Sequence, residues 1–157
     1  MKNIFFTTIA SLFFLSSCSS DTAVSPAINI ENCSVNGELV SGVPSVKVGD
    51  VVELSLNLAG NGSELGSFQA KVDEKEIKMS LADYEKGSVS DEKNFTDTTA
   101  CRLRFVDGVK VSNVKVKAMV QSVDVDHINM KFYLFAAKAN CEGSELNVEL
   151  KKDESVK

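Results

Sequence analysis

Four cysteines and one histidine are the most reactive side chains of this 157-residue chain. Cys18 stands between an apolar run and a polar segment, so its thiol could end a membrane span, form a disulfide or carry a lipid. The apolar run, residues 4–15, is shorter than the roughly 20 residues that cross a membrane, and it contains three hydroxyl side chains. Lys2 before the run and two serines after it complete the regions of a secretory signal.

The residues Leu15-Ser16-Ser17-Cys18 resemble a bacterial lipobox, in which leucine and two small residues precede an invariant cysteine. The resemblance implies that the Cys18 thiol is acylated, that residues 1–17 are removed as a signal peptide, and that the new amino terminus is acylated too. Residues 18–26 are then the acylated cysteine and a flexible tether. Ser19 after the cysteine favours the outer membrane. The alternative is an ordinary signal peptide with Cys18 near its cleavage site.

His127 follows Asp124 and Asp126, which could orient its imidazole as a general base or share a metal ion with it. The two aspartates and Asn129 could also offer oxygen ligands to calcium. No serine or cysteine nucleophile motif accompanies His127, and the dense ligand spacing of calcium loops is lacking. We therefore expect an exposed turn here, and neither a catalytic residue nor a metal site nor a cofactor.

The composition is that of one globular domain behind the signal. Hydrophobic residues make up 43% and charged residues 25% of the chain, and 157 − 17 = 140 residues remain after the signal. The formal net charge of −5 argues against nucleic acid, whose partners carry basic patches.

Nearly every segment after Pro26 alternates between apolar and polar residues, which predicts half-buried β-strands. A change of parity within 109–120 predicts a bulge or break near Ser112-Asn113, and Asp107-Gly108 predicts a hairpin before it. Besides a first strand around Cys33, the expected strands cover residues 46–58, 68–72, 77–81, 101–105, 109–120, 128–136 and 146–150.

Seven or eight short strands without a long helix predict an all-β fold, an immunoglobulin-like β-sandwich over residues 27–151 with a frayed tail at 152–157. The stretch SVKVGDVVELSLNLAGNGSELGSFQAKVD also resembles the immunoglobulin-like modules of Bacteroidetes surface lipoproteins, which implies the same fold. A lipocalin-like β-barrel is the alternative.

Three cysteines remain if Cys18 is acylated, so one of the remaining thiols stays free. In an immunoglobulin-like sandwich the start of the first strand and the last hairpin share one end. This fold therefore implies a disulfide between Cys33 and Cys141. The alternative joins Cys101 to Cys141, if the segment 82–100 reverses the assumed strand order.

The segment 82–100 is polar and fits the strand pattern poorly, with one helical turn expected near residues 83–86. Long loops in compact domains are usually functional or mobile. Tyr84 and Phe95 are the aromatic residues best placed for exposure, which makes them the candidates for an interaction loop; the alternative, which we favour, is a solvated loop with one aromatic residue packed inward. Asp21-Thr22-Ala23 and Asp97-Thr98-Thr99 resemble the pattern of Bacteroidetes protein O-glycosylation, which implies modification of Thr22 and Thr98.

These features predict a lipid-anchored, non-enzymatic β-sandwich of the cell envelope, at the outer membrane, that mediates protein or glycan interactions. Its expected partners are the membrane, through the lipid anchor, and a protein or glycan, but no nucleic acid. The alternatives are a small-ligand-binding barrel or small hydrolase around His127, and an accessory subunit of an outer-membrane complex.

Overall fold

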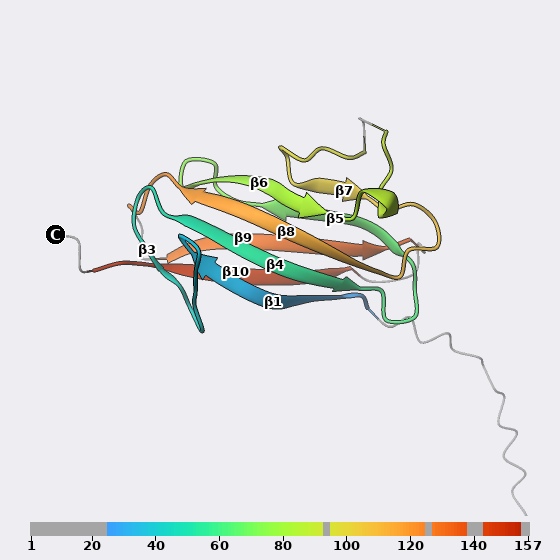
Figure 1. The fold of residues 1–157 in the computed structure, drawn as a ribbon, viewed down its shortest axis with the longest axis horizontal. Coiled ribbons are helices and arrows are strands. Elements are labelled where there is room, and N and C mark those ends of the chain that lie inside the picture. Colours follow the sequence, from blue (N-terminus) through green and yellow to red (C-terminus); the bar gives the residue numbers. More distant parts are fainter. Residues whose placement is uncertain (1–24, 93–94, 125–126, 138–142, 155–157) are drawn as a thin grey trace, which may run out of the picture.

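Two five-stranded sheets packed face to face make up the fold of the computed structural model, which describes residues 25–92, 95–124, 127–137 and 143–154 (Figure 1). Sheet A has the order β2-β1-β4-β8-β6 and sheet B the order β3-β10-β9-β5-β7. The elements are β1 (Ala27–Val35), β2 (Glu38–Leu39), β3 (Ser45–Val46), β4 (Val51–Ala59), β5 (Leu65–Lys71), β6 (Ile77–Tyr84), the 3₁₀ helix η1 (Lys86–Ser88), β7 (Arg102–Arg104), β8 (Val111–Val120), β9 (His127–Ala136) and β10 (Ser144–Lys152).

This architecture confirms the predicted all-β, immunoglobulin-like sandwich. The two sheets remain open at their edges and do not join into one closed sheet, so the lipocalin-like alternative is wrong. No helix in the described part of the chain is long and apolar enough to cross a membrane.

The described residues form ten strands, compared with the seven or eight expected, because they include two additional strands of two residues each. The expected continuous strand 46–58 is divided between β3 and β4. Gly49 turns the chain there with a φ of 91°, and Asp50 accepts a hydrogen bond from the Lys47 backbone N–H at 3.0 Å. Val48, expected on the apolar face, is therefore 57% exposed.

The core fills the space between the sheets with the inward residues of alternating strands. β4 contributes Leu54, Leu56 and Leu58, each at most 1% exposed. From sheet B, Phe68 and Phe132 lie with their ring centroids 6.2 Å apart. As expected for residues 128–136, β9 is internal to its sheet, between β10 and β5. One buried face on each strand is what the period of two requires.

The predicted bulge near Ser112-Asn113 is wrong, because β8 pairs with β4 without a register shift from Val111 to Met119. Ser112 takes the inward position and is 1% exposed, while Val111 points outward. The Ser112 hydroxyl lies 3.2 Å from the Ser88 hydroxyl, which offers a hydrogen-bond partner inside the core. The alternation of Val109 and Val111 predicts that Ser112 faces solvent. In the structure Ser112 is instead buried, and another side chain is within hydrogen-bonding distance.

The expected hairpin at Asp107-Gly108 is also wrong. β7 belongs to sheet B and β8 to sheet A, so this turn carries the chain from one sheet to the other. Gly108 still supplies the positive φ of the turn, 87°. The dipeptide correctly indicated a tight turn, but the chain crosses to the other sheet after it.

The orientation of β8 can be tested with the same substitution at two valines of that strand. Val116→Ala removes two buried carbon atoms and should lower the free energy of unfolding by about 1.5–3 kcal/mol. Val111→Ala, at a position that is 56% exposed, should change it by less than about 0.5 kcal/mol. Urea unfolding curves measure both values. A larger loss for Val111→Ala would show that a bulge does reverse the strand.

Candidate functional site

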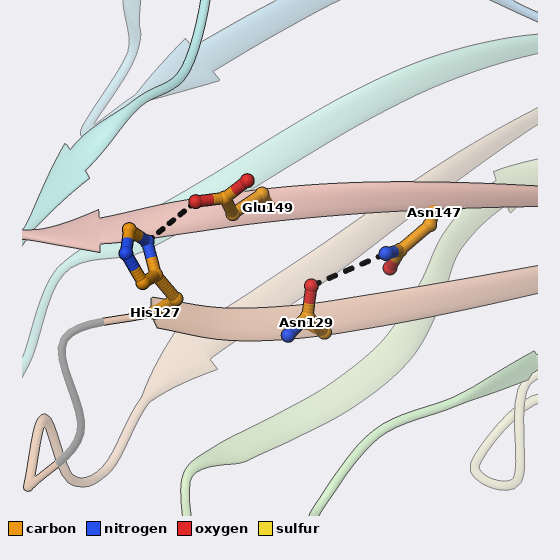
Figure 2. A network of polar contacts seen from close by, with 4 residues as sticks. All are labelled: His127, Asn129, Asn147 and Glu149. Carbon is orange, nitrogen blue, oxygen red and sulfur yellow. Dashed lines mark hydrogen bonds and ion pairs between the residues drawn. The ribbon is translucent and has the colours of Figure 1, made fainter.

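His127 is the first residue of β9, and its Nδ1 pairs with Oε1 of Glu149 on β10 (Figure 2). Beside this pair, Asn147 donates a hydrogen bond to Asn129 Oδ1 at 3.3 Å. The antiparallel register places Glu149 opposite Asn129, diagonal to His127, so all of these side chains meet on the outer face of sheet B. A carboxylate that contacts the imidazole therefore comes from the neighbouring strand, 22 residues away in the sequence.

Among the predicted histidine and calcium site residues that the structure describes, none completes either site with His127. Asp124 is exposed ahead of β9, and Asp126 lies outside the described residues. His127 itself is 53% exposed and begins a strand, where a turn was expected. Within the described ranges no group of three or more histidine, cysteine, aspartate or glutamate residues could hold a metal ion.

A shallow groove opens elsewhere on the outer face of sheet B, where β7, β5 and β9 run side by side. Strand register places Ser67 of β5 between Arg104 of β7 and Phe135 of β9. Because serine is small and its neighbours are long, this row of three residues is low in the middle. The next row consists of Arg102, Gln69 and Tyr133.

The segment before β7 closes this groove with Phe95. The Arg104 guanidinium lies 5.7 Å from the centre of the Phe95 ring, within the range of a cation–π interaction. Backbone hydrogen bonds of 2.8 and 2.9 Å between Asp97 and Arg102 hold the segment to β7. We call this site the aromatic–arginine groove; it has a volume of about 200 Å³ and its exposed lining consists of Ser67, Gln69, Phe95, Arg102, Arg104 and Phe135.

The two phenylalanines present much of their surface to solvent: Phe95 is 47% and Phe135 46% exposed. Gly143, next to β10, allows the Phe135 ring to lie there, since a Cβ at this glycine would come within 2.7 Å of a ring carbon. Both arginines of the chain stand in this groove, on a strand of three residues. Planar rings and planar cations together offer stacking surface and paired hydrogen-bond donors.

The structure does not bring the two residues of the predicted interaction loop together. Phe95 lies over sheet B, whereas Tyr84 ends β6 in sheet A, where it is half-buried against the core. The helical turn expected at 83–86 occurs slightly later, as η1. Sequence reasoning missed Phe135 and the arginines, although Phe135 stood on the polar side of an alternating strand. That outward position was the available signal.

Neither of the two described cysteines, Cys33 and Cys101, lines the groove. No disulfide is observed among the described residues: Cys33 and Cys101 are free, and Cys18 and Cys141 lie outside the described residues. The pairings Cys33–Cys141 and Cys101–Cys141 therefore stay predictions. Burial raises the pKa of the half-buried Cys33 thiol, and burial together with the nearby Asp97 carboxylate raises the pKa of Cys101 to about 11.

The predicted glycosylation triplet 97–99 forms a turn built on its aspartate. Asp97 Oδ1 accepts hydrogen bonds from the Thr99 hydroxyl at 2.7 Å and from the backbone N–H groups of Thr99 and Ala100. The bond from the Thr99 hydroxyl is the main cause that lowers the pKa of Asp97. Thr98 is half-buried, and Thr22 lies outside the described residues. Modification of both threonines stays a prediction.

The sequence profile of a family described as a domain of unknown function (DUF5035) matches residues 18–152. No curated protein matches the chain in sequence.

Solved structures similar to this fold share little sequence with it. The major pilin subunit of Bacillus cereus is 11% identical with a TM-score of 0.50, over 82% of this chain and 40% of the pilin. A conjugative transposon lipoprotein from Bacteroides eggerthii is 14% identical (TM-score 0.45; 76% of this chain, 97% of that one). A DUF4466 family protein from Parabacteroides merdae is 13% identical (TM-score 0.45; 82% and 45%). At these identities, the pilin comparison supports the fold alone.

The two free thiols should differ in reactivity, because only the thiolate attacks an alkylating reagent. In the native protein at pH 8, after reduction of any disulfide and removal of the reductant, iodoacetamide should modify Cys33 well before Cys101, whose pKa of about 11 and 2% exposure both protect it. Peptide mass spectrometry over a time course measures the two rates. In denaturant the rates should converge, and equal rates in the native protein would contradict the buried position of Cys101.

Proposed function

We propose that this chain, which belongs to the DUF5035 family, is a lipid-anchored, non-enzymatic β-sandwich of the bacterial outer membrane that binds a protein or glycan partner. The observation that carries the proposal is the aromatic–arginine groove. Exposed rings and guanidinium groups on a rigid sheet face are typical of binding surfaces, where aromatic residues and arginine are enriched.

The chemistry of the groove favours binding over catalysis. Its exposed lining consists of two phenylalanines, two arginines, a serine and a glutamine. None of these side chains is a general base beside Ser67, which a serine nucleophile requires. His127, the one histidine of the chain, is instead held by Glu149 at the start of β9. The groove therefore offers contacts for a ligand without a paired nucleophile and base.

The amino-terminal segment supports the anchor. The lipobox-like Leu15-Ser16-Ser17-Cys18 follows a signal-like run, and the family match begins at Cys18 itself. The short tether that follows leads directly into β1 at Ala27. A sandwich fixed to a membrane by acyl chains needs only one free face to bind a partner, and the outer face of sheet B is available for that purpose.

We include in the proposal an envelope location for this domain, which the signal-like run and the lipobox-like residues before Ser19 support. We include in the proposal that the threonines of the two Asp-Thr triplets, Thr22 and Thr98, carry O-linked glycans. Thr22 lies in the tether and Thr98 in the turn beside β7.

The anchor can be tested with matched cysteine variants of the full chain in a Gram-negative host. Wild type and Cys33→Ala should incorporate labelled palmitate and fractionate with the outer membrane. Cys18→Ala should lose both properties, because the acylated thiol is gone. Globomycin should cause the uncleaved precursor of the wild type to accumulate. Palmitate in the Cys18→Ala protein would refute the anchor.

A further inference from the structure

We propose that the aromatic–arginine groove binds a carboxylate-bearing glycan, with one sugar ring on the phenylalanines and its carboxylate on Arg104. This inference rests on the proposed function, since it names the class of partner that the same surface takes. Four features of the groove carry it: the location of the arginines, the exposure of the rings, the neutral polar groups between them, and the size of the groove.

The arginines indicate an anionic partner. The chain has 17 basic residues and a net charge of −5, yet both of its arginines occur on β7. A guanidinium group matches a carboxylate with two parallel hydrogen bonds, which an ammonium group cannot do. Arg102 already acts on a carboxylate of the protein, because it helps to lower the pKa of Asp97.

Arg104 is the arginine that is placed for a ligand. Its side chain lies over the Phe95 ring, and it makes no ion pair with any residue in the described ranges. The ring restricts the guanidinium to one side of the groove, which reduces the conformational entropy lost on binding. Arg104 can therefore receive an external carboxylate without giving up an ion pair with any described residue.

The phenylalanines and the residues between them suit a sugar ring. Phe95 and Phe135 present open ring faces, and the negative face of an aromatic ring attracts the positively polarised C–H groups on the flat side of a sugar. Ser67 and Gln69, in the low part of the groove, can hydrogen-bond with hydroxyl groups.

The size of the groove favours one unit of a longer chain. Its volume of about 200 Å³ is below the roughly 300–1,000 Å³ of pockets that enclose a whole small ligand. A stable protein partner would cover about 800 Å² per side around an apolar centre, whereas the next row on this face consists of Arg102, Gln69 and Tyr133, each with a polar group. A second aromatic–cation pair lies farther along β5 and β9, with Lys71 Nζ 5.5 Å from the centre of the Tyr133 ring. A glycan chain could continue along this face.

Binding can be measured with the full lipidated chain in detergent, immobilised for biolayer interferometry. The probes are polygalacturonate, alginate and hyaluronan, all of which carry carboxylates, and fully methyl-esterified polygalacturonate, in which the carboxylates are blocked. We expect at least one acidic polymer to bind, with an affinity that falls as salt is raised. The methyl ester should bind at least 10-fold more weakly than polygalacturonate if polygalacturonate is bound.

Variants locate the site. Arg104→Gln should weaken binding of the acidic polymer about 10- to 100-fold. Arg104→Lys should lose most of that affinity although it keeps the charge, because it lacks the planar pair of donors. Phe135→Ala should weaken binding several-fold. The matched controls Lys117→Gln and Met119→Ala remove an exposed cation and an exposed apolar side chain from the outer face of sheet A and should leave binding unchanged. Circular dichroism confirms the fold of each variant.

Three outcomes would overturn the inference: no binding of any acidic polymer, equal binding of the acid and its methyl ester, or equal losses in the groove variants and the sheet A controls. These outcomes are separate from the failure of the proposed function. If no acidic polymer binds but crosslinking in cells captures a protein through Phe95 or Phe135, the proposed binding function is supported and the proposal of a glycan ligand is refuted. If Cys18→Ala remains lipidated, the anchor fails whatever the groove binds.

Discussion

The burial of one apolar face of each sheet against the other is the constraint on which the rest of this structure depends. Leu56 of β4 and Phe132 of β9 are both 0% exposed, and they belong to different sheets. Because side chains alternate along a strand, fixing these inward positions also fixes which residues face solvent. The strength of this constraint is visible at Ser112, which is drawn into the core by the register of β8 and lies within hydrogen-bonding distance of Ser88.

The same constraint creates the groove. Only the inner face of sheet B has to be apolar to form the core. The outward side chains of β7, β5 and β9 are not limited by that requirement and can be polar, charged or aromatic. Register then places Arg104, Ser67 and Phe135 in one row. Their spacing is set by the backbone of the sheet and not by a loop, so the floor of the groove is rigid. Among the described residues that line it, only Phe95 comes from a connecting segment, and hydrogen bonds between Asp97 and Arg102 hold that segment against β7.

The alternation of apolar and polar residues along each segment predicted the fold well. This alternation can be read from neighbouring residues, and the packing of the two sheets buries the apolar side of each strand. Local patterns failed where the outcome depended on distant partners. Gly49-Asp50 after Val48 is a turn signal, but nothing near it in the sequence shows that the chain passes there from one sheet to the other. Asp107-Gly108 likewise looks the same whether the next strand pairs with the preceding one or lies in the other sheet. The candidate site was harder still. Phe95 could be selected as an exposed aromatic residue, but its proximity to Phe135, 40 positions away, depends on a register that one sequence does not reveal.

The position of the groove also bears on what it can reach. Ser25, at the end of the tether, accepts a hydrogen bond from Asn61 in the turn after β4. That turn lies beside the start of β5, where Leu65 pairs with Ala136, directly next to Phe135. The groove and the tether are therefore at the same end of the sandwich. With Cys18 as the proposed anchor, the eight residues 19–26 extend at most about 29 Å, so a ligand in the groove is held close to the membrane surface and not at the distal tip of the domain.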